Sequence, residues 1–543
     1  MCYVTAILIG TPTAGLSCSC CTTSNASHRA NHHLNKSQRT PTSPALRYYC
    51  SLAFALPEGR RCRKMAVVTE GGNASSGDSD STTAHMPHVL MVSFPAQGHL
   101  NPLLRFAKRI AAKGILVTLC STHDIGHRIS ASTANSALGV PVPVGRGFVR
   151  FEFYSDDLPI DDPRRGDLEV LMAALRATGP PAISDLIRRH ADAGRPVSCV
   201  INNPFVPWAL DVAAEMGIPS GVLWVQSCAV FIAYYGYYHS LAKFPTEDDP
   251  HVTVNLPGLP PLEEGEIPTF LHPSSPYKML KKVILEQFHN ISKASWVFAN
   301  SFDELERDAI DAISHRLSII PVGPLVEPDQ SSLRSDVRSD IFKVADCMDW
   351  LESQAPRSVV YVSVGSVVVL SKEETAELAW GLSDCGRPFL WVVRGDTQAL
   401  LPEGFLESVG DRGLVVGWSP QDRVLTHPAV ACFVTHCGWN STLEALAAGV
   451  PLVTYPQWGD QVPNSKFLVE TYGVGVHLRA PATREDVERC VAAVTRGLLA
   501  ETIIRRAAEW REAAAKAVAE GGSSDRHIQA LVDEIRKTVN PAV

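Results

Sequence analysis

Several polar side chains gather in residues 418–461, where each short apolar run ends in a turn. One such run, residues 431–435 (Ala-Cys-Phe-Val-Thr), has the character of a buried strand and is followed by a turn that ends at Gly438. Ser441 and Glu444 have the spacing of a capping box, so we expect a helix to begin at Ser441. A strand, a glycine turn and a helix N-terminus together present backbone N–H groups and the positive end of a helix dipole. This stretch therefore predicts a binding site for a phosphate group.

A histidine near the start of the regular pattern, His99, could accept a proton. It follows the apolar run 88–94 and precedes a helix that we expect to start near Asn101 and Pro102. Open α/β sheets place their ligand crevice at this position, between the carboxyl end of a strand and the next helix. A helix N-terminus disfavours the imidazolium, so we expect a neutral ring near pH 7. The residues alone leave two interpretations open, a general base or a histidine that only hydrogen-bonds within a turn.

The 44 residues 418–461 closely resemble the signature box of plant secondary-product UDP-glycosyltransferases. The Trp, His, Trp, Asn, Ser, Glu, Asp and Gln of that box are all in place without a gap, and the resemblance extends over about residues 86–538. Members of this family (family 1) have the GT-B fold. The resemblance therefore implies an α/β protein with two Rossmann-like domains that face each other across a cleft.

The resemblance also assigns roles to single residues. One set of side chains and turns would bind the UDP-sugar: Ser366, Trp418, Gln421, His436, Gly438, Trp439, Asn440, Ser441, Glu444, Asp460 and Gln461. In this set Trp418 would stack on the uracil ring, and Gln421 would contact the base or the ribose. Glu444 would accept the ribose hydroxyls, a use that excludes the capping box. A glutamine at the last position, Gln461, is associated with glucose, and His99 aligns with the family's general base.

One position departs from the family pattern. Many members carry an aspartate eight residues before the position of Asp211, where it orients and charges the catalytic histidine, but this chain has Asn203. An amide can hold the imidazole ring, but it cannot stabilise the imidazolium as a carboxylate does. A weaker base handicaps a phenol of pKa about 10 and matters little for an acid that is already ionised. The alternative is that Asn203 only supports the turn before Pro204.

The string Ile-Asn-Asn-Pro-Phe-Val-Pro-Trp at residues 201–208 resembles the family branch that makes glucose esters of hydroxycinnamic, benzoic and gallic acids. We therefore expect an inverting enzyme that transfers glucose from UDP-glucose to the carboxylate of a small aromatic acceptor, forming a 1-O-β-glucose ester. Two alternatives stay open, an O-glucosyltransferase of phenolic hydroxyls (flavonoids or hormones) and a non-catalytic UDP-sugar-binding protein. No metal and no cofactor are expected, because the helix N-terminus and His436 would stabilise the leaving UDP.

The chain of 543 residues is too long for a single core. The pattern of strands and helices predicts an N-terminal Rossmann-like domain over residues 86–326, which the resemblance implies is acceptor-binding, and a polar linker over 327–345. A C-terminal UDP-sugar-binding Rossmann-like domain is expected over 346–520. In the family, the tail that corresponds to 521–543 forms a helix that packs back on the first domain.

Residues 1–85 differ in kind from the rest. They hold eight basic and four acidic residues, many Ser, Thr and Asn, and six of the 14 cysteines. Glu58 is the only acid before Met65, a bias typical of transit peptides, and the alternative is that translation begins at Met65 or Met86. In both cases we expect a disordered extension. The expected location is the cytoplasm, or the chloroplast if the extension is genuine.

The composition excludes several partners. A formal charge of −8 argues against nucleic acid or an anionic membrane, and no apolar run reaches the roughly 18 residues of a membrane span. The cysteines after residue 85 are scattered singly, without a CxxC pair, so we expect neither a zinc site nor a disulfide framework. The expected partners are the UDP-sugar and the small aromatic acceptor, bound by a monomer.

Overall fold

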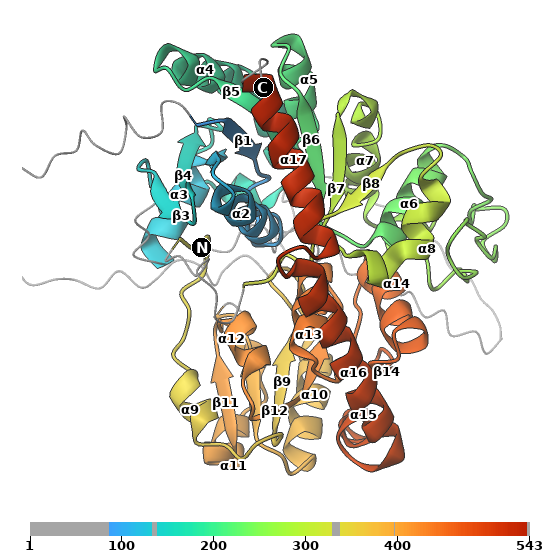
Figure 1. The fold of residues 1–543 in the computed structure, drawn as a ribbon. Helices are drawn as coiled ribbons and strands as arrows, with labels where there is room; N and C mark the ends of the chain where they lie inside the picture. Colours follow the sequence, from blue (N-terminus) through green and yellow to red (C-terminus); the bar gives the residue numbers. More distant parts are fainter. Residues whose placement is uncertain (1–85, 133–137, 328–336, 396, 540–543) are drawn as a thin grey trace, which may run out of the picture. The chain divides into compact units, whose positions relative to one another are not determined.

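The computed structural model describes residues 86–132, 138–327, 337–395 and 397–539 (Figure 1). The predicted extension over residues 1–85 and the centre of the predicted linker, residues 328–336, lie outside the described residues.

The described chain forms two β-sheets, which confirms the α/β fold class. The first has the strand order β3-β4-β2-β1-β5-β6-β7-β8. Its strands are β1 (His88–Val92), β2 (Leu116–Thr122), β3 (Val142–Val144), β4 (Gly147–Tyr154), β5 (Val197–Asn202), β6 (Ser220–Trp224), β7 (Trp296–Ala299) and β8 (Ile319–Pro321). The second has the order β11-β10-β9-β12-β13-β14. Its strands are β9 (Val359–Ser363), β10 (Phe389–Val392), β11 (Gly413–Val416), β12 (Val430–Thr435), β13 (Leu452–Thr454) and β14 (Gly475–His477). All neighbours run parallel except β3 and β4.

Helices connect the parallel strands. Those of the first half are α2 (Gln97–Ala112), α3 (His123–Ser132), α4 (Leu168–Asp192), α5 (Trp208–Glu215), α6 (Cys228–Tyr238), α7 (Lys278–Glu286) and α8 (Asp303–Ile313). Those of the second half are α9 (Met348–Glu352), α10 (Lys372–Asp384), α11 (Phe405–Val409), α12 (Gln421–Thr426), α13 (Trp439–Ala448), α14 (Gln461–Lys466), α15 (Arg484–Thr495) and α16 (Gly497–Val518), followed by α17 (Ser523–Val539).

The order of the strands creates a crevice in each sheet. β1 is continuously apolar after its first residue and fully buried, as expected for a parallel strand covered on both faces. It lies between β2 and β5, so the chain continues from β1 towards one edge of the sheet through β2 and towards the other edge through β5. β9 lies in the same way between β10 and β12. Ligands of open α/β sheets bind at the carboxyl ends of strands at such switch points.

The last helix, α17, packs on the first sheet, whereas the helix before it, α16, packs on α13 of the second half (Figure 1). The apolar residues Ile528, Leu531, Val532 and Ile535 of α17 are buried in one cluster with residues of β1 and α2. The tail thus returns to the half of the chain in which the described fold begins.

Helix α2 begins earlier than expected. Its first residue is Gln97 rather than Asn101, so His99 lies within the first turn of the helix and Pro102 lies inside it. A proline has no N–H group, so the carbonyl four residues before it, that of Gly98, lacks its helical donor. The side chain of Asn440 supplies a donor instead, with Nδ2 2.9 Å from the Gly98 oxygen.

Among the described helices none is both long enough and apolar enough to cross a bilayer. The eight described cysteines are buried and none of them forms a disulfide: Cys120, Cys199, Cys228, Cys347, Cys385, Cys432, Cys437 and Cys490.

Candidate active site

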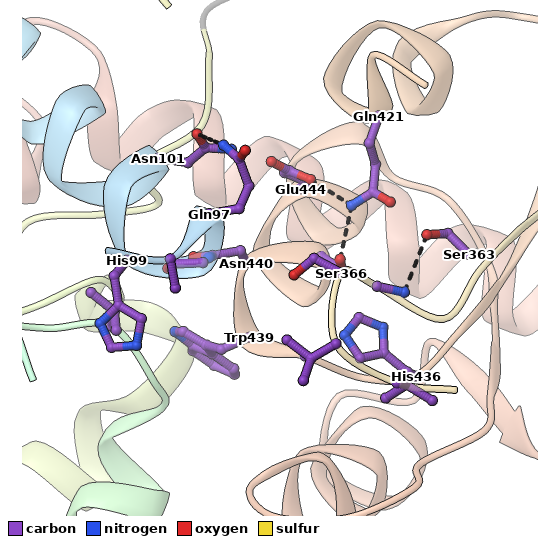
Figure 2. A pocket seen from close by; sticks show the side chains of 18 of the residues that line it. Gln97, His99, Asn101, Ser363, Ser366, Gln421, His436, Trp439, Asn440 and Glu444 are labelled. Atoms are coloured by element: carbon purple, nitrogen blue, oxygen red, sulfur yellow. Dashed lines mark hydrogen bonds between the residues drawn. The ribbon is translucent and has the colours of Figure 1, made fainter. Parts of the chain in front are cut away.

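A cavity of about 340 Å³ lies at the carboxyl ends of β1, β9 and β12 and collects nearly all of the predicted site residues (Figure 2). Those that line it are His99, Ser366, Trp418, Gln421, His436, Gly438, Trp439, Asn440, Ser441, Glu444, Asp460 and Gln461. Asn203 does not line it. Residues separated by more than 300 positions in the sequence therefore surround one space.

His99 lies in an apolar corner of this cavity. The centroid of its ring is 5.1 Å from that of Phe94 and 5.1 Å from that of Phe205. Burial lowers the pKa of His99 to about 4, and the nearby amide of Asn203 opposes this shift to a smaller extent. The Nδ1 atom is buried and no hydrogen bond of ordinary geometry reaches it within the described chain. The imidazole is therefore neutral at pH 7.

Asn203 is fully buried behind His99 and binds the backbone around it. Its Oδ1 accepts a hydrogen bond from the N–H of Phe94 (3.0 Å), and its Nδ2 donates to the carbonyl of His99 (3.0 Å) and to Oγ of Ser93 (3.3 Å). Asn203 thus fixes the turn between β1 and α2. No carboxylate of the described chain contributes to the pKa of His99.

Phe205, two residues after Asn203, adopts a left-handed backbone conformation with φ of 80°. A bulky residue rarely takes this conformation, and such strain is typical of binding sites. The N–H of Phe205 donates to Oε1 of Gln287 (3.2 Å), which helps to hold the turn. The conformation places the Phe205 ring against the imidazole of His99.

His436 is held between two glycines at the carboxyl ends of β9 and β12. A Cβ atom at Gly365 or at Gly438 would lie 2.5 or 2.4 Å from Nε2 of His436, so both positions need glycine. Burial lowers the pKa of His436 to about 4, against a raising effect of a backbone hydrogen bond with Ser363. The next residue, Cys437, is left-handed with φ of 66°. This turn leads from the neutral ring of His436 into helix α13.

The N-terminus of α13 is open towards the cavity. Gly438 is the N-cap, and no side chain caps the helix. The first N–H groups of the helix therefore have no side-chain acceptor of their own, which is the arrangement of an anion site. The indole Nε1 of Trp439 donates to the carbonyl of Asn300 (2.7 Å) and so fixes the start of α13 against the first half of the chain.

The predicted start of α13 at Ser441 and its capping box are wrong, because α13 begins two residues earlier and Glu444 has other partners. Its Oε1 lies 2.7 Å from Nη2 of Arg105, and its Oε2 accepts a hydrogen bond from Nε2 of Gln421 (2.7 Å). The same Nε2 donates to Oγ of Ser441 (2.8 Å), and Oε1 of Gln421 accepts from the hydroxyl of Tyr361 (3.1 Å). The amide of Gln421 is therefore engaged within the protein, where it orients Glu444 and Ser441.

Trp418 has one covered face. The ring of Phe342, which lies within the predicted linker, packs against it with centroids 4.5 Å apart and planes inclined by 30°. Because Trp418 also lines the cavity, a flat base could stack only on its other face.

Asp460 and Gln461 lie beside Gln226, which also lines the cavity. Burial raises the pKa of Asp460 to about 6, and hydrogen bonds, including those from Gln226 and Asn464, oppose this shift. Oε1 of Gln461 accepts hydrogen bonds from the backbone of Gln457 (2.9 Å) and Trp458 (3.4 Å). The amide nitrogen of Gln461 and the carboxylate of Asp460 are then the groups of these two residues that could contact a polar ligand in the cavity.

The sequence did not reveal the apolar lining on the side of His99. It consists of residues from the turn after β5, from α4, from the short 3₁₀ helix Thr269–Leu271 and from α7: Phe205, Leu168, Leu171, Phe270, Leu280 and Ile284. These elements are far apart in sequence, and no pattern marks single apolar residues among many others. A signal did exist for the polar lining Gln97, Asn101 and Arg105, which recur every four residues on one face of α2.

Within the described ranges, no three His, Cys, Asp or Glu side chains come together as a metal site.

Comparisons with known proteins agree with this geometry. Residues 342–507 match the family described as UDP-glucoronosyl and UDP-glucosyl transferase, and residues 87–137 match the glycosyltransferase N-terminal domain. The gallate 1-beta-glucosyltransferase of Quercus robur is 48% identical over 461 residues, which cover 83% of this chain and 90% of that protein. The cinnamate beta-D-glucosyltransferase of Fragaria ananassa is 46% identical over 463 residues, 83% of each chain.

A crystal structure of Os79 from O. sativa in complex with UDP is similar in fold, with a TM-score of 0.73 and 33% sequence identity. The match covers 82% of this chain and 100% of that one. The two sheets, the cavity between them and 48% identity over 83% of the chain lead to one conclusion: this protein is an enzyme of the UDP-glycosyltransferase family, with the GT-B fold.

Proposed function

We propose that the enzyme transfers glucose from UDP-glucose to the carboxylate of a small aromatic acid and releases a 1-O-β-glucose ester. The observation that carries this proposal is the environment of His99, a neutral imidazole between two phenylalanine rings that no carboxylate of the described residues supports. Such an imidazole is a weak base. It is poorly suited to take the proton of a phenol and sufficient for an acceptor that arrives ionised.

The donor would lie along the second sheet. The N-terminus of α13, His436, Ser366 and Ser441 would surround the diphosphate, Trp418 would stack on uracil, and Glu444 would accept the ribose hydroxyls. The hexose would reach Asp460 and Gln461 at the other end of the cavity.

The acceptor would enter between the apolar residues around His99 and point its carboxylate at the anomeric carbon. An oxygen of the carboxylate forms the new bond to this carbon while the bond to the UDP oxygen breaks, and its electron pair leaves with UDP. A single displacement of this kind inverts the α-linked donor to a β-linked ester. His99 would orient the attacking oxygen, and the helix dipole would stabilise the charge that develops on UDP.

The relatives support the acceptor class, since their names specify gallate and cinnamate. The apolar lining from α4 and α7 suits an aromatic ring. We extend the proposal to the domains: residues 86–326 would bind the acceptor, residues 346–520 the UDP-sugar, with residues 327–345 as linker and the tail from 521 closing on the first domain.

We also propose that the enzyme needs no metal ion and acts as a monomer in the cytoplasm. The described cysteines support a reducing compartment, because all eight are buried thiols without a disulfide. Size-exclusion chromatography with light scattering tests the monomer.

The alternative within the family is transfer to a phenolic hydroxyl. The observation in its favour is that His99 is present and lines the cavity, where it could take a proton. The other alternative from the sequence, a UDP-sugar-binding protein without catalysis, does not agree with the enzyme family to which the chain belongs.

A panel of aromatic acids and phenols, each with UDP-glucose, UDP-galactose and UDP-glucuronate, tests these possibilities by product mass. We expect the highest kcat/KM for an acid with UDP-glucose, and a product that mild alkali hydrolyses as it does an ester. An alkali-stable product formed from phenols in preference to acids would replace the ester proposal by the phenol alternative. No turnover with any pair would contradict both the proposed donor and the proposed acceptor class.

A further inference from the structure

The two helices that carry the predicted base and the predicted nucleotide ligands contact each other at two points. In the first half, α2 carries His99 in its first turn, and in the second half α13 carries Asn440 and Glu444. Figure 2 shows the side chain of Asn440 between those of His99 and Glu444. We call the pair of contacts the α2–α13 clasp.

The first contact of the clasp is the hydrogen bond from Nδ2 of Asn440 to the carbonyl of Gly98, at 2.9 Å. It exists because Pro102 cannot donate to that carbonyl. Gly98 directly precedes His99, so this bond fixes the backbone next to the imidazole.

The second contact is the ion pair of Arg105 and Glu444, with Nη2 and Oε1 2.7 Å apart and both side chains 8% exposed. Nη1 of Arg105 also donates to the carbonyl of Leu325 (3.1 Å), and its Nε lies 3.9 Å from Oε1 of Glu327, the first residue of the predicted linker. Arg105 is thus held by the first half of the chain and reaches across to the second. A buried carboxylate that lost this partner would carry an uncompensated charge.

The ion pair with Arg105 fixes the orientation of the Glu444 carboxylate. Arg105 engages one carboxylate oxygen and Gln421 the other, so the plane of the carboxylate is fixed from both sides. A carboxylate has about four acceptor positions, and two remain for a pair of vicinal hydroxyls. Fixing the group in advance lowers the entropic cost of binding the ribose.

We propose that Arg105 is a positioning residue for the nucleotide: it holds Glu444 in the orientation that receives the ribose, and it ties that orientation to the helix that carries His99. The proposal rests on the function proposed above for Glu444. Its consequence is that donor affinity depends on contact between the two halves. When the halves separate, Arg105 leaves with α2, and Glu444 loses its orientation together with its counter-ion.

A double-mutant cycle tests the proposal on the full-length enzyme, with the best acceptor of the panel and UDP-glucose as donor. The variants are Arg105→Met, which keeps the length and apolar stem of the side chain, Glu444→Gln, and the double variant. We expect Arg105→Met to raise the KM for UDP-glucose and the Kd for UDP by about tenfold or more, since it removes a charged hydrogen bond. The KM for the acceptor should change by less than about threefold. The double variant should be no worse than the poorer single variant, because both remove the same interaction.

Lys113→Met is the matched control. Lys113 follows the last turn of the same helix and pairs with Asp525 of α17 at 2.6 Å, so its loss also removes an ion pair between α2 and a distant part of the chain. It does not line the cavity, and its KM for UDP-glucose should equal that of the unmodified enzyme. Arg105→Lys, which restores the charge, should recover part of the lost affinity.

Three results would overturn the proposal. In the first, Arg105→Met leaves the KM for UDP-glucose unchanged although Glu444→Gln raises it. In the second, the two substitutions are additive. In the third, Lys113→Met raises the KM as much as Arg105→Met does. If Glu444→Gln itself has no effect on UDP binding, the ribose role of Glu444 fails first, and the role of Arg105 fails with it. Should Arg105→Met not fold, Arg105→Lys in the same cycle decides, with a smaller expected rise in KM.

Discussion

The side-chain amide of Asn440 donates to the backbone carbonyl of Gly98, a bond that joins helix α13 to the residue before His99. The carbonyl is available only because Pro102 lies one helical turn further along α2. A proline inside a helix is usually a cost in stability. Here its missing N–H group creates an acceptor at the point where the two halves of the chain meet.

Replacing this proline should weaken the contact. In Pro102→Ala the new N–H group can donate to the Gly98 carbonyl and compete with Asn440. We expect the KM for UDP-glucose to rise by roughly threefold to tenfold, because one hydrogen bond between the halves is lost. The melting temperature should not fall, since alanine favours the helix. Kinetics and thermal unfolding measure both effects. Pro181→Ala, at an exposed proline within α4, is the control and should leave the KM unchanged. A lower melting temperature with an unaltered KM would contradict this account of Pro102.

A methyl group at Gly365 should displace His436. The added Cβ would lie 2.5 Å from Nε2 of the imidazole, and the left-handed φ of +81° adds strain. We expect Gly365→Ala to lower kcat/KM by about two orders of magnitude, the effect of a displacement of about 1 Å in a catalytic site. Gly386→Ala separates strain from displacement, because Gly386 has a φ of +64° and no atom within 4 Å of the added Cβ. Equal losses of activity in both variants would refute the role of His436.

A carboxylate next to His99 should change the preferred acceptor. Asn203→Asp introduces a charge that stabilises the imidazolium, so the pKa of His99 should rise from about 4 and the rate with phenols should increase relative to acids. Aspartate cannot donate to the His99 carbonyl or to Ser93, so some stability should be lost. Asn203→Ala loses these two bonds, and also the one from the N–H of Phe94, without adding charge, and it serves as the control. The ratio of kcat/KM for a phenol and an acid is the measurement. An unchanged ratio in Asn203→Asp would count against our explanation of the acceptor class.

The loss of His99 should lower the rate of transfer to phenols more than the rate of transfer to acids. We expect His99→Ala to abolish transfer to phenols, which must lose a proton, and to reduce transfer to acids less severely. The measurement is kcat for both acceptor types above pH 6, where the carboxylate is ionised. Equal losses for the two acceptors would assign to His99 a role in orientation alone.

Asp460 should make stability depend on pH. Its pKa in the folded chain, about 6, lies above the ordinary value of 3.8, so the folded state binds the proton more tightly than the unfolded state does. The burial of this group therefore costs stability above pH 6, and the cost fades as the pH falls towards 4. Asp460→Asn removes the charge and should stabilise the fold at pH 8 by at most about 3 kcal/mol, with no gain near pH 4. Denaturant unfolding at the two pH values measures this difference, and activity should be lost in the variant because a sugar ligand is removed. A gain of equal size at both pH values would show that the charge is not its cause.

Removal of divalent metal ions should leave the activity intact. The charge on the leaving diphosphate would be stabilised by the N-terminus of α13 and by hydrogen bonds from neutral groups such as His436. Dialysis against EDTA followed by an assay with UDP-glucose measures this. Activity that disappears and returns with Mg²⁺ or Mn²⁺ would assign a metal to the reaction.

The sequence predicted the two sheets and the composition of the cavity well, because strands of parallel sheets read as apolar runs and the box of residues 418–461 has fixed spacing. The ends of elements were less accurate. The apolar run extends over residues 88–94, but β1 ends at Val92. The strand does not continue to Phe94, because the N–H of Phe94 donates to the side chain of Asn203 instead of to a neighbouring strand. The prediction of a capping box at Ser441 and Glu444 was wrong for a similar reason, since Glu444 pairs with a buried arginine, Arg105, from a helix more than 300 residues away.

Those partners could not be read from the sequence, because they depend on how the two halves meet. The ion pair of Arg105 with Glu444 and the contact of Phe342 with Trp418 join residues whose local patterns indicate only a helix face and a linker. The left-handed conformation of Phe205 is likewise invisible in the sequence, since bulky residues rarely adopt it.

The apolar end of the cavity is assembled from α4, α7, the turn after β5 and the 3₁₀ helix Thr269–Leu271, whereas the end that we propose for the diphosphate comes from the turns after β9 and β12. On the proposed function, selectivity for the acceptor can therefore evolve by exchange of side chains such as Leu171, Phe270 or Ile284, while the residues proposed to bind the UDP-sugar stay unchanged. For enzyme engineering, the acceptor range can therefore be widened with a library of substitutions at these few positions, without changing residues of the second sheet.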